Sequence, residues 1–204
     1  NAPMARWLAL VSAVLGLLVT IPLYQHFDTA TSAMQFVELS PWIHRFNVNY
    51  HLGVDGISMW FVILNAFITV IVVIAGWEVI KEKVAQYMAA FLIMSGLMNG
   101  IFSALDGVLF YVFFEASLIP MYLIIGIWGG PNRVYAAFKF FLYTLLGSLL
   151  LLIAFLWLFL EAGGKFGILD WHELPIGMTA QTLIFWAFLI SFAVKVPMWP
   201  VHTW

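Results

Sequence analysis

Six long apolar stretches alternate with polar connections along the chain. Each stretch holds about 20 residues with few charges, the length that an α-helix needs to cross the hydrocarbon core of a bilayer. The stretches run near residues 4–24, 56–77, 87–105, 108–128, 134–160 and 182–204. Two connections, Asp106-Gly107 and Gly129–Asn132, are short and carry turn-forming residues, so the helices that they join are expected to be antiparallel neighbours. The pattern predicts an all-α membrane protein with about six transmembrane helices.

The composition agrees with lipid as the main solvent. Of the 204 residues, 64% are hydrophobic and only 9% are charged, whereas soluble domains carry roughly a quarter charged residues. The net charge of −2 leaves no basic footprint for nucleic acid. The absence of cysteine excludes thiolate metal sites and cysteine-ligated iron–sulfur clusters within this chain.

The two ends of the chain suggest a longer parent protein. The chain begins Asn1-Ala2-Pro3 without an initiator Met and stops at Trp204 inside an apolar stretch. Residues 4–24 are too long and too uniformly apolar for the hydrophobic region of a signal peptide. We therefore expect a single transmembrane domain over residues 1–204 that is a fragment.

The basic residues of the connections indicate an orientation. The connections at 25–55 and 161–181 are acidic and hold only Arg45 and Lys165 among the basic residues. Four basic residues fall on the other side, which the positive-inside rule assigns to the cytoplasm or its equivalent. They are Arg6, Lys81, Lys83 and Arg133.

A glutamate lies inside the fourth apolar stretch. Glu115 is about two turns into the stretch, at ~3.6 residues per turn, and its neighbours are aromatic and aliphatic. A carboxylate at such a depth costs at least ~2.5 kcal/mol unless it is paired or neutral. The residue either has a function or is held at the interface or by a neighbouring helix as part of the packing.

A lysine lies in the last apolar stretch beside two prolines. Lys195 is more than halfway along that stretch, and Pro197 and Pro200 follow it. Each proline lacks a helical donor and disturbs the turn before it, so the carbonyls of Ala193 and Val196 are expected to lose their usual partners. A charge beside a broken helix is typical of ion sites in transporters. The alternative is a lysine whose long stem carries its ammonium to the interface.

Opposite charges in separate helices suggest that Glu115 and Lys195 form a pair. A nearby acid favours the protonated lysine, and withdrawal of that acid favours release of the proton. Two further residues are candidates for proton transfer. Lys139 lies less than two turns inside its stretch and either takes part or reaches the interface. His202 follows Lys195 by about two turns and is either a relay or a structural hydrogen bonder.

Four segments of the chain resemble a known family. Residues Phe113–Gly129 (FFEASLIPMYLIIGIWG) resemble the glutamate-bearing helix of the antiporter-like membrane subunits of respiratory complex I, and Phe192–Trp204 (FAVKVPMWPVHTW) resemble their broken lysine helix. Asn49–Ser58 resemble the start of the family's third helix, and Asn132–Ser148 resemble the helix between the two charged ones. The family contains bacterial NADH:quinone oxidoreductase chain M and mitochondrial NADH dehydrogenase subunit 4.

The resemblance implies a fold and a set of roles. The family has roughly fourteen helices in two inverted repeats, and this chain resembles the second to the seventh helix, the last one broken. The resemblance implies that Glu115 is the acid of a proton-translocating pair and Lys195 its partner. It also implies that His202 leads from Lys195 toward a lysine later in the family's sequence, and that Lys139 takes part in translocation.

The resemblance also implies partners and a location. NADH, FMN, iron–sulfur clusters and quinone are expected in partner subunits, with no cofactor or metal in this chain. The expected partners are other complex I membrane subunits, the lipid bilayer and protons, without nucleic acid. The expected location is the bacterial cell inner membrane, or the mitochondrial inner membrane if the protein is eukaryotic.

Two other functions remain open on sequence grounds. A related cation/proton antiporter or a membrane-bound hydrogenase complex has subunits that share the acid and lysine helices. A haem-binding or scaffolding subunit belongs to a different class. Haem b usually needs paired intramembrane histidines, and only His202 lies at depth, so a haem absorbance band in the purified protein would be needed to support that function.

The orientation can be tested with single cysteines, because the chain has none of its own. We expect cysteines at Ser32 and Gln86 to react with an impermeant thiol reagent from opposite sides of the membrane. The physical reason is the asymmetry of the basic residues between the connections. Labelling of both positions from the same side would contradict the topology.

Overall fold

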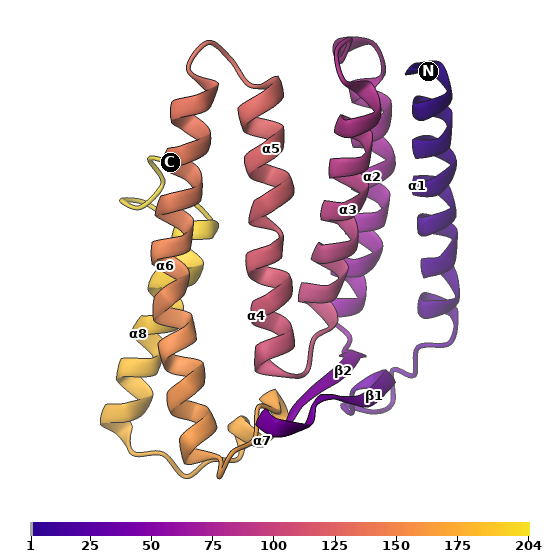
Figure 1. Ribbon diagram of the computed structural model, residues 1–204. Helices are drawn as coiled ribbons and strands as arrows, with labels where there is room; N and C mark the ends of the chain where they lie inside the picture. Colours follow the sequence, from indigo (N-terminus) through magenta and orange to yellow (C-terminus); the bar gives the residue numbers. More distant parts are fainter. Residues whose placement is uncertain (1) are drawn as a thin grey trace.

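The computed structural model describes residues 2–204 and consists of membrane-length helices in a row, with a small hairpin at one end (Figure 1). Six helical columns are long and apolar enough to cross a membrane, and α4 and α5 together form one of them. The all-α membrane fold predicted from the sequence is confirmed, with one small sheet added to it. The helices are α1 (Ala2–Gln25), α2 (Ser58–Val79), α3 (Val84–Ser103), α4 (Gly107–Ala116), α5 (Leu118–Trp128), α6 (Arg133–Glu161), α7 (Ile168–His172) and α8 (Met178–Lys195).

The two ends of the bundle differ in structure. The hairpin and α7 lie together at the lower end in Figure 1, and the connections after α2 and α5 lie at the upper end with the N-terminus. At the upper end the Arg6 guanidinium donates to the carbonyl of Ile80 at 3.0 Å. The Trp128 indole donates to the carbonyl of Glu82 at 2.9 Å. The connection that holds Lys81 and Lys83 is therefore bonded to α1 and α5, on the side opposite the hairpin.

The sequence did not predict the hairpin. Strands β1 (Gln35–Ile43) and β2 (Val48–Val54) pair antiparallel across a 3-10 turn, η1 (His44–Phe46). Nearly every residue of β1 is exposed, so the strand has no alternation of buried and exposed positions. On β2, Val48 and Val54 are buried. Because the buried apolar residues lie on one strand only, the segment gives no alternating pattern that would have predicted a hairpin.

A buried aspartate connects the hairpin to the helix that carries Glu115. Asp106 is 1% exposed and caps α4. One carboxylate oxygen accepts from the amides of Val108 at 2.9 Å and Leu109 at 3.1 Å. The other oxygen accepts from the amide of Asn49 in β2 at 3.0 Å. Burial raises the pKa of Asp106, and the three amide donors act in the opposite direction.

Backbone hydrogen bonds strengthen the same junction. The amide of Leu105 donates to His51 of β2 at 2.8 Å, and the carbonyl of Leu105 accepts from Ile168 of α7 at 2.9 Å. The amide of Gly107 donates to Phe166 at 2.8 Å. The start of α4 is therefore held between two segments that are distant in the sequence, and the depth of Glu115 is fixed from this end.

Polar side chains join α2 and α3 at membrane depth. The Asn65 amide group donates to the carbonyl of Ser95 at 2.9 Å and to the Asn99 side chain at 2.7 Å. The Thr69 hydroxyl donates to the Ser95 hydroxyl at 2.7 Å. Interhelical hydrogen bonds of this kind hold bundles together in lipid, where apolar burial alone distinguishes poorly between partners.

The Asp106 junction can be tested against a second capping aspartate. We expect Asp106→Ala to destabilise the folded protein by about 2–4 kcal/mol, because the change removes a cap and leaves the half-buried amide of Asn49 without its acceptor. Asp55→Ala is the control, since within residues 2–204 its carboxylate accepts from the local amides of Ile57 and Ser58 and joins no distant segment. The loss of a local cap costs about 1 kcal/mol. Thermal unfolding in detergent measures both variants, and equal melting shifts would contradict the role of Asp106 in joining the hairpin to α4.

Candidate functional site

The structure brings Glu115 and Lys195 together. The Lys195 ammonium lies 3.8 Å from a carboxylate oxygen of Glu115, across the contact between α8 and α4. The two side chains are 16% and 18% exposed, respectively. The pair therefore lies in a medium of low polarity, where a charge interaction is much stronger than in water.

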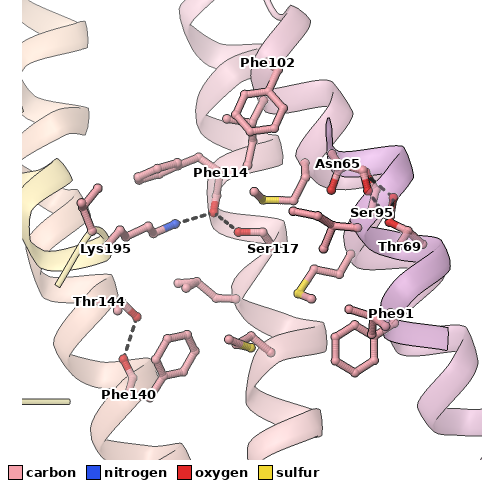
Figure 2. A pocket seen from close by; sticks show the side chains of 18 of the residues that line it. Asn65, Thr69, Phe91, Ser95, Phe102, Phe114, Ser117, Phe140, Thr144 and Lys195 are labelled. Atoms are coloured by element: carbon pink, nitrogen blue, oxygen red, sulfur yellow. Dashed lines mark hydrogen bonds between the residues drawn. The ribbon is translucent and has the colours of Figure 1, made fainter. Parts of the chain in front are cut away.

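The shortest contact of the Lys195 ammonium is with the backbone of α4. The ammonium donates to the carbonyl of Phe114 at 2.6 Å and lies 3.3 Å from the centroid of the Phe114 ring (Figure 2). Ser117 also donates to this carbonyl, at 2.8 Å. The column is interrupted here between α4 and α5, one turn before Pro120, whose ring disturbs the preceding turn. The interruption lets a side chain from another helix reach a main-chain oxygen, and the ring adds a cation–π contact.

The carboxylate of Glu115 has no hydrogen-bond donor of its own. Both of its oxygens are buried and lack a hydrogen-bond partner among residues 2–204. On the neighbouring helix α6, the Ser148 hydroxyl donates to the carbonyl of Leu145 at 2.8 Å. An ionised carboxylate at this position would have the Lys195 charge nearby and no hydrogen bond. Such a group is costly to bury unless a neighbouring donor turns toward it.

The last helix ends at Lys195 and does not continue to Trp204. The sequence predicted a broken span to the end of the chain and a carbonyl of Ala193 without a partner. That carbonyl instead accepts from the amide of Met198 at 2.9 Å, because Pro197 has no N–H to offer. The carbonyl of Val194 accepts from the Trp204 indole at 2.6 Å. The segment after Lys195 therefore folds back and satisfies the end of α8 itself.

Lys139 and His202 lie apart from the Glu115–Lys195 pair. The Lys139 ammonium donates to the carbonyl of Thr203 at 2.6 Å. The His202 side chain is exposed and makes no hydrogen bond or ion pair within the described part of the chain. Both residues thus belong to the segment after α8 or to its contact with α6, and the structure joins neither to Glu115.

A cavity of about 520 Å³ lies next to the Lys195 ammonium. Lys195 and Thr144 are on one wall, and the Asn65, Thr69 and Ser95 cluster is on the other (Figure 2). Apart from Ser117, the remaining lining is apolar and includes several methionines and phenylalanines. The cavity gives the ammonium space to move away from Phe114. No group of acidic, histidine or cysteine residues in the described chain is arranged to hold a metal ion.

Sequence reasoning missed several polar groups around the pair. Ser148 is 1% exposed and lies on α6, which packs against α4. Ser191 lies one turn before Lys195, is 1% exposed, and has a hydroxyl without a partner among the described residues. The spacing of four residues between Ser191 and Lys195 on an apolar helix was a signal that could have identified it. The carbonyl of Phe114 carried no signal in the sequence.

Two family models together match almost the whole chain. Residues 4–103 match the amino terminus of NADH-ubiquinone oxidoreductase chain 4, and residues 104–204 match the NADH:quinone oxidoreductase/Mrp antiporter transmembrane family. NADH-quinone oxidoreductase subunit M of Rhodobacter capsulatus is 50% identical over 98% of this chain and 41% of the relative. NADH-ubiquinone oxidoreductase chain 4 of Arabidopsis thaliana is 43% identical over 98% of this chain and 40% of the relative. The chain thus spans about two fifths of the length of these relatives.

Solved structures show the same fold. A chain of respiratory complex I from Thermus thermophilus with bound NADH is 32% identical with a TM-score of 0.86, over 98% of this chain and 41% of that chain. A chain of the Mrp complex from Dietzia sp. matches at a TM-score of 0.86 with 18% identity, over 100% of this chain and 22% of that chain, which shows a shared fold only. This chain belongs to the family of antiporter-like membrane subunits of NADH:quinone oxidoreductase, which includes these subunit M and chain 4 proteins.

Proposed function

We propose that this chain translocates protons across an energy-transducing membrane, as part of one membrane subunit of NADH:quinone oxidoreductase. One observation carries the proposal: Glu115 and Lys195 are opposite charges on separate helices, buried and 3.8 Å apart. Ionisable residues inside membrane spans are rare and usually mark ion or proton pathways. The similarity to NADH-quinone oxidoreductase subunit M supports the coupling to electron transfer.

Lys195 is the proposed proton carrier, and Glu115 controls it. The carbonyl and ring of Phe114 stabilise the ammonium on one side, and a charged Glu115 stabilises it on the other. If Glu115 becomes neutral or moves away, the ammonium loses its counter-charge and more readily releases a proton. The cavity beside Lys195 allows its side chain to swing between a receiving and a releasing position.

Lys139 and His202 are proposed as later stations for the proton. Lys139 donates to the carbonyl of Thr203, the residue after His202, so both lie around the segment that follows α8. Lysine and histidine can each hold and release a proton. In this proposal the proton moves along this segment, on the side of Lys195 that faces away from the hairpin.

The redox chemistry is proposed to take place in partner subunits. NADH, FMN, iron–sulfur clusters and quinone would bind there, and this chain would respond to a conformational or electrostatic change passed through neighbouring membrane subunits. The chain itself has no cysteine to ligate a cluster. The proposed location is the bacterial cell inner membrane, or the mitochondrial inner membrane in a eukaryote.

A second candidate function is cation/proton antiport, as in Mrp complexes or in a related membrane-bound hydrogenase complex. The family description that includes the Mrp antiporter, and the shared fold with the Dietzia Mrp complex, favour this candidate. Co-purification separates the two functions. We expect the complete protein to purify with NADH:quinone oxidoreductase activity, and purification without it would favour the antiporter.

The first functional prediction concerns Glu115→Gln, which keeps the size of the side chain and removes its charge. At 4 Å, two charges interact by about 1–4 kcal/mol for surroundings between water and a protein surface. About 1.4 kcal/mol is a factor of ten in a rate, so we expect the rate of proton pumping at a given rate of NADH oxidation to fall about fivefold or more, with assembly of the complex retained. Glu115→Asp keeps the charge and is expected to be milder. Pumping at the wild-type ratio by the Gln variant would reject the role of Glu115.

The second functional prediction separates a proton carrier from a structural cation. Arginine keeps the positive charge but is effectively always protonated, so we expect Lys195→Arg to assemble and to pump poorly. Lys195→Ala leaves Glu115 without a counter-charge and is expected to lower the amount of assembled complex. Assembly is measured by native gel and pumping in vesicles. Near-normal pumping by Lys195→Arg, together with lost assembly in Lys195→Ala, would show that the lysine is structural.

A further inference from the structure

The ring of Phe114 is held in one orientation beside Lys195. The residue is 7% exposed, and its ring stacks on Phe110 with the ring centroids 5.4 Å apart. It also meets Phe192 of α8 at 6.0 Å and 89°. Three residues after Phe192, the same helix supplies the ammonium that lies 3.3 Å from the centroid of the Phe114 ring. Aromatic contacts on two helices therefore keep the ring beside the cation.

This ring binds one protonation state of Lys195 and not the other. The face of an aromatic ring carries partial negative charge, so it attracts an ammonium and gives no such attraction to a neutral amine. The carbonyl of Phe114, 2.6 Å from the same nitrogen, acts in the same direction. A hydrogen bond from a charged donor is roughly twice as strong as one from a neutral donor. Loss of the proton from Lys195 therefore weakens both contacts at once.

The site stays complete when the lysine side chain moves off the ring. The carbonyl of Phe114 also accepts from the Ser117 hydroxyl at 2.8 Å, so it keeps a hydrogen bond without Lys195. The cavity of about 520 Å³ borders both Phe114 and Lys195, and polar side chains of α2 and α3 line its far wall (Figure 2). A lysine that enters this space regains side-chain rotamer freedom that it gives up on the ring.

We propose that Phe114 is a positioning residue that senses the charge of Lys195: its ring face keeps the side chain beside Glu115 while the nitrogen carries a proton, and lets the side chain enter the cavity once the nitrogen is neutral. Phe114 exchanges no proton itself. Its effect is that Glu115 acts on a lysine that is in place whenever it is loaded. The proposal rests on the proposed function, because it requires Lys195 to gain and lose a proton during turnover.

The test changes the charge on the ring face and leaves the shape of the ring nearly the same. Phe114 is replaced by mono-, di- and trifluorinated phenylalanine, because each fluorine draws electron density from the face that attracts the cation. The same series at Phe110 is the control. That ring packs against Phe114 and Phe155, and no cation lies over it within residues 2–204. All variants are made in the complete complex, and assembly is measured by native gel.

The readout is the rate of proton pumping at a given rate of NADH oxidation. We expect this rate to fall with each added fluorine at position 114, by about tenfold for the trifluorinated ring, because the ammonium leaves the ring before Glu115 has acted on it. Phe114→Leu removes the ring, keeps the carbonyl, and is expected to fall as far as the trifluorinated variant. The series at position 110 is expected to keep the wild-type rate. A purely structural role of Phe114 would not follow the number of fluorines.

The outcomes distinguish this inference from the proposed function. If Lys195→Arg pumps at the wild-type rate, Lys195 is not the proton carrier, and the proposed function fails together with the role of Phe114. If Lys195→Arg pumps poorly and the rate is the same throughout the series at position 114, the role of the ring is wrong and the proposed function stands. A fall of the same size in the series at position 110 would also overturn the inference.

Discussion

The buried ammonium of Lys195 is the constraint on which the rest of the site depends. A cation in the interior of a membrane bundle needs partners that stay in place, and α4 supplies them through the carbonyl and the ring of Phe114. The carbonyl is within reach of Lys195 at the point where α4 gives way to α5, and α8 ends at Lys195 itself. Two interrupted helices therefore meet at one point. Regular helices would have kept both backbones closed to an outside side chain.

Because the backbone binds the cation, the acid is left free to act on it. Glu115 lies 3.8 Å from the ammonium and has no hydrogen bond of its own. If the carboxylate were the main support of Lys195, a change in its charge would threaten the fold. In this arrangement the change alters the electrostatic energy of the ammonium while Phe114 still holds it. A reversible proton carrier requires one group that keeps the cation in place, here Phe114, and a second group that changes its proton affinity, here Glu115.

The position of Glu115 along the bundle is determined from the end that carries the hairpin. Asp106 caps α4, and Glu115 follows nine residues later, about 13.5 Å along the helix axis at 1.5 Å per residue. The same carboxylate accepts from the amide of Asn49 in β2. A displacement of the hairpin would therefore be passed to the start of α4 through a buried hydrogen bond. The hairpin, which the sequence presents as a connection between two spans, in this way helps to position the site.

The sequence by itself determined the membrane fold, the number of helical columns and the two charged residues. Apolar stretches of membrane length and the cost of charge in lipid are local properties that can be read along the chain, and they singled out Glu115 and Lys195. Only the tertiary structure decided which groups surround those charges. The carbonyl of Phe114 that binds Lys195 and the buried cap of Asp106 both depend on contacts between segments far apart in the sequence. Hydropathy reports whether a residue lies in lipid or water, but a hydrogen bond depends on the distance between two atoms, and packing alone sets that distance.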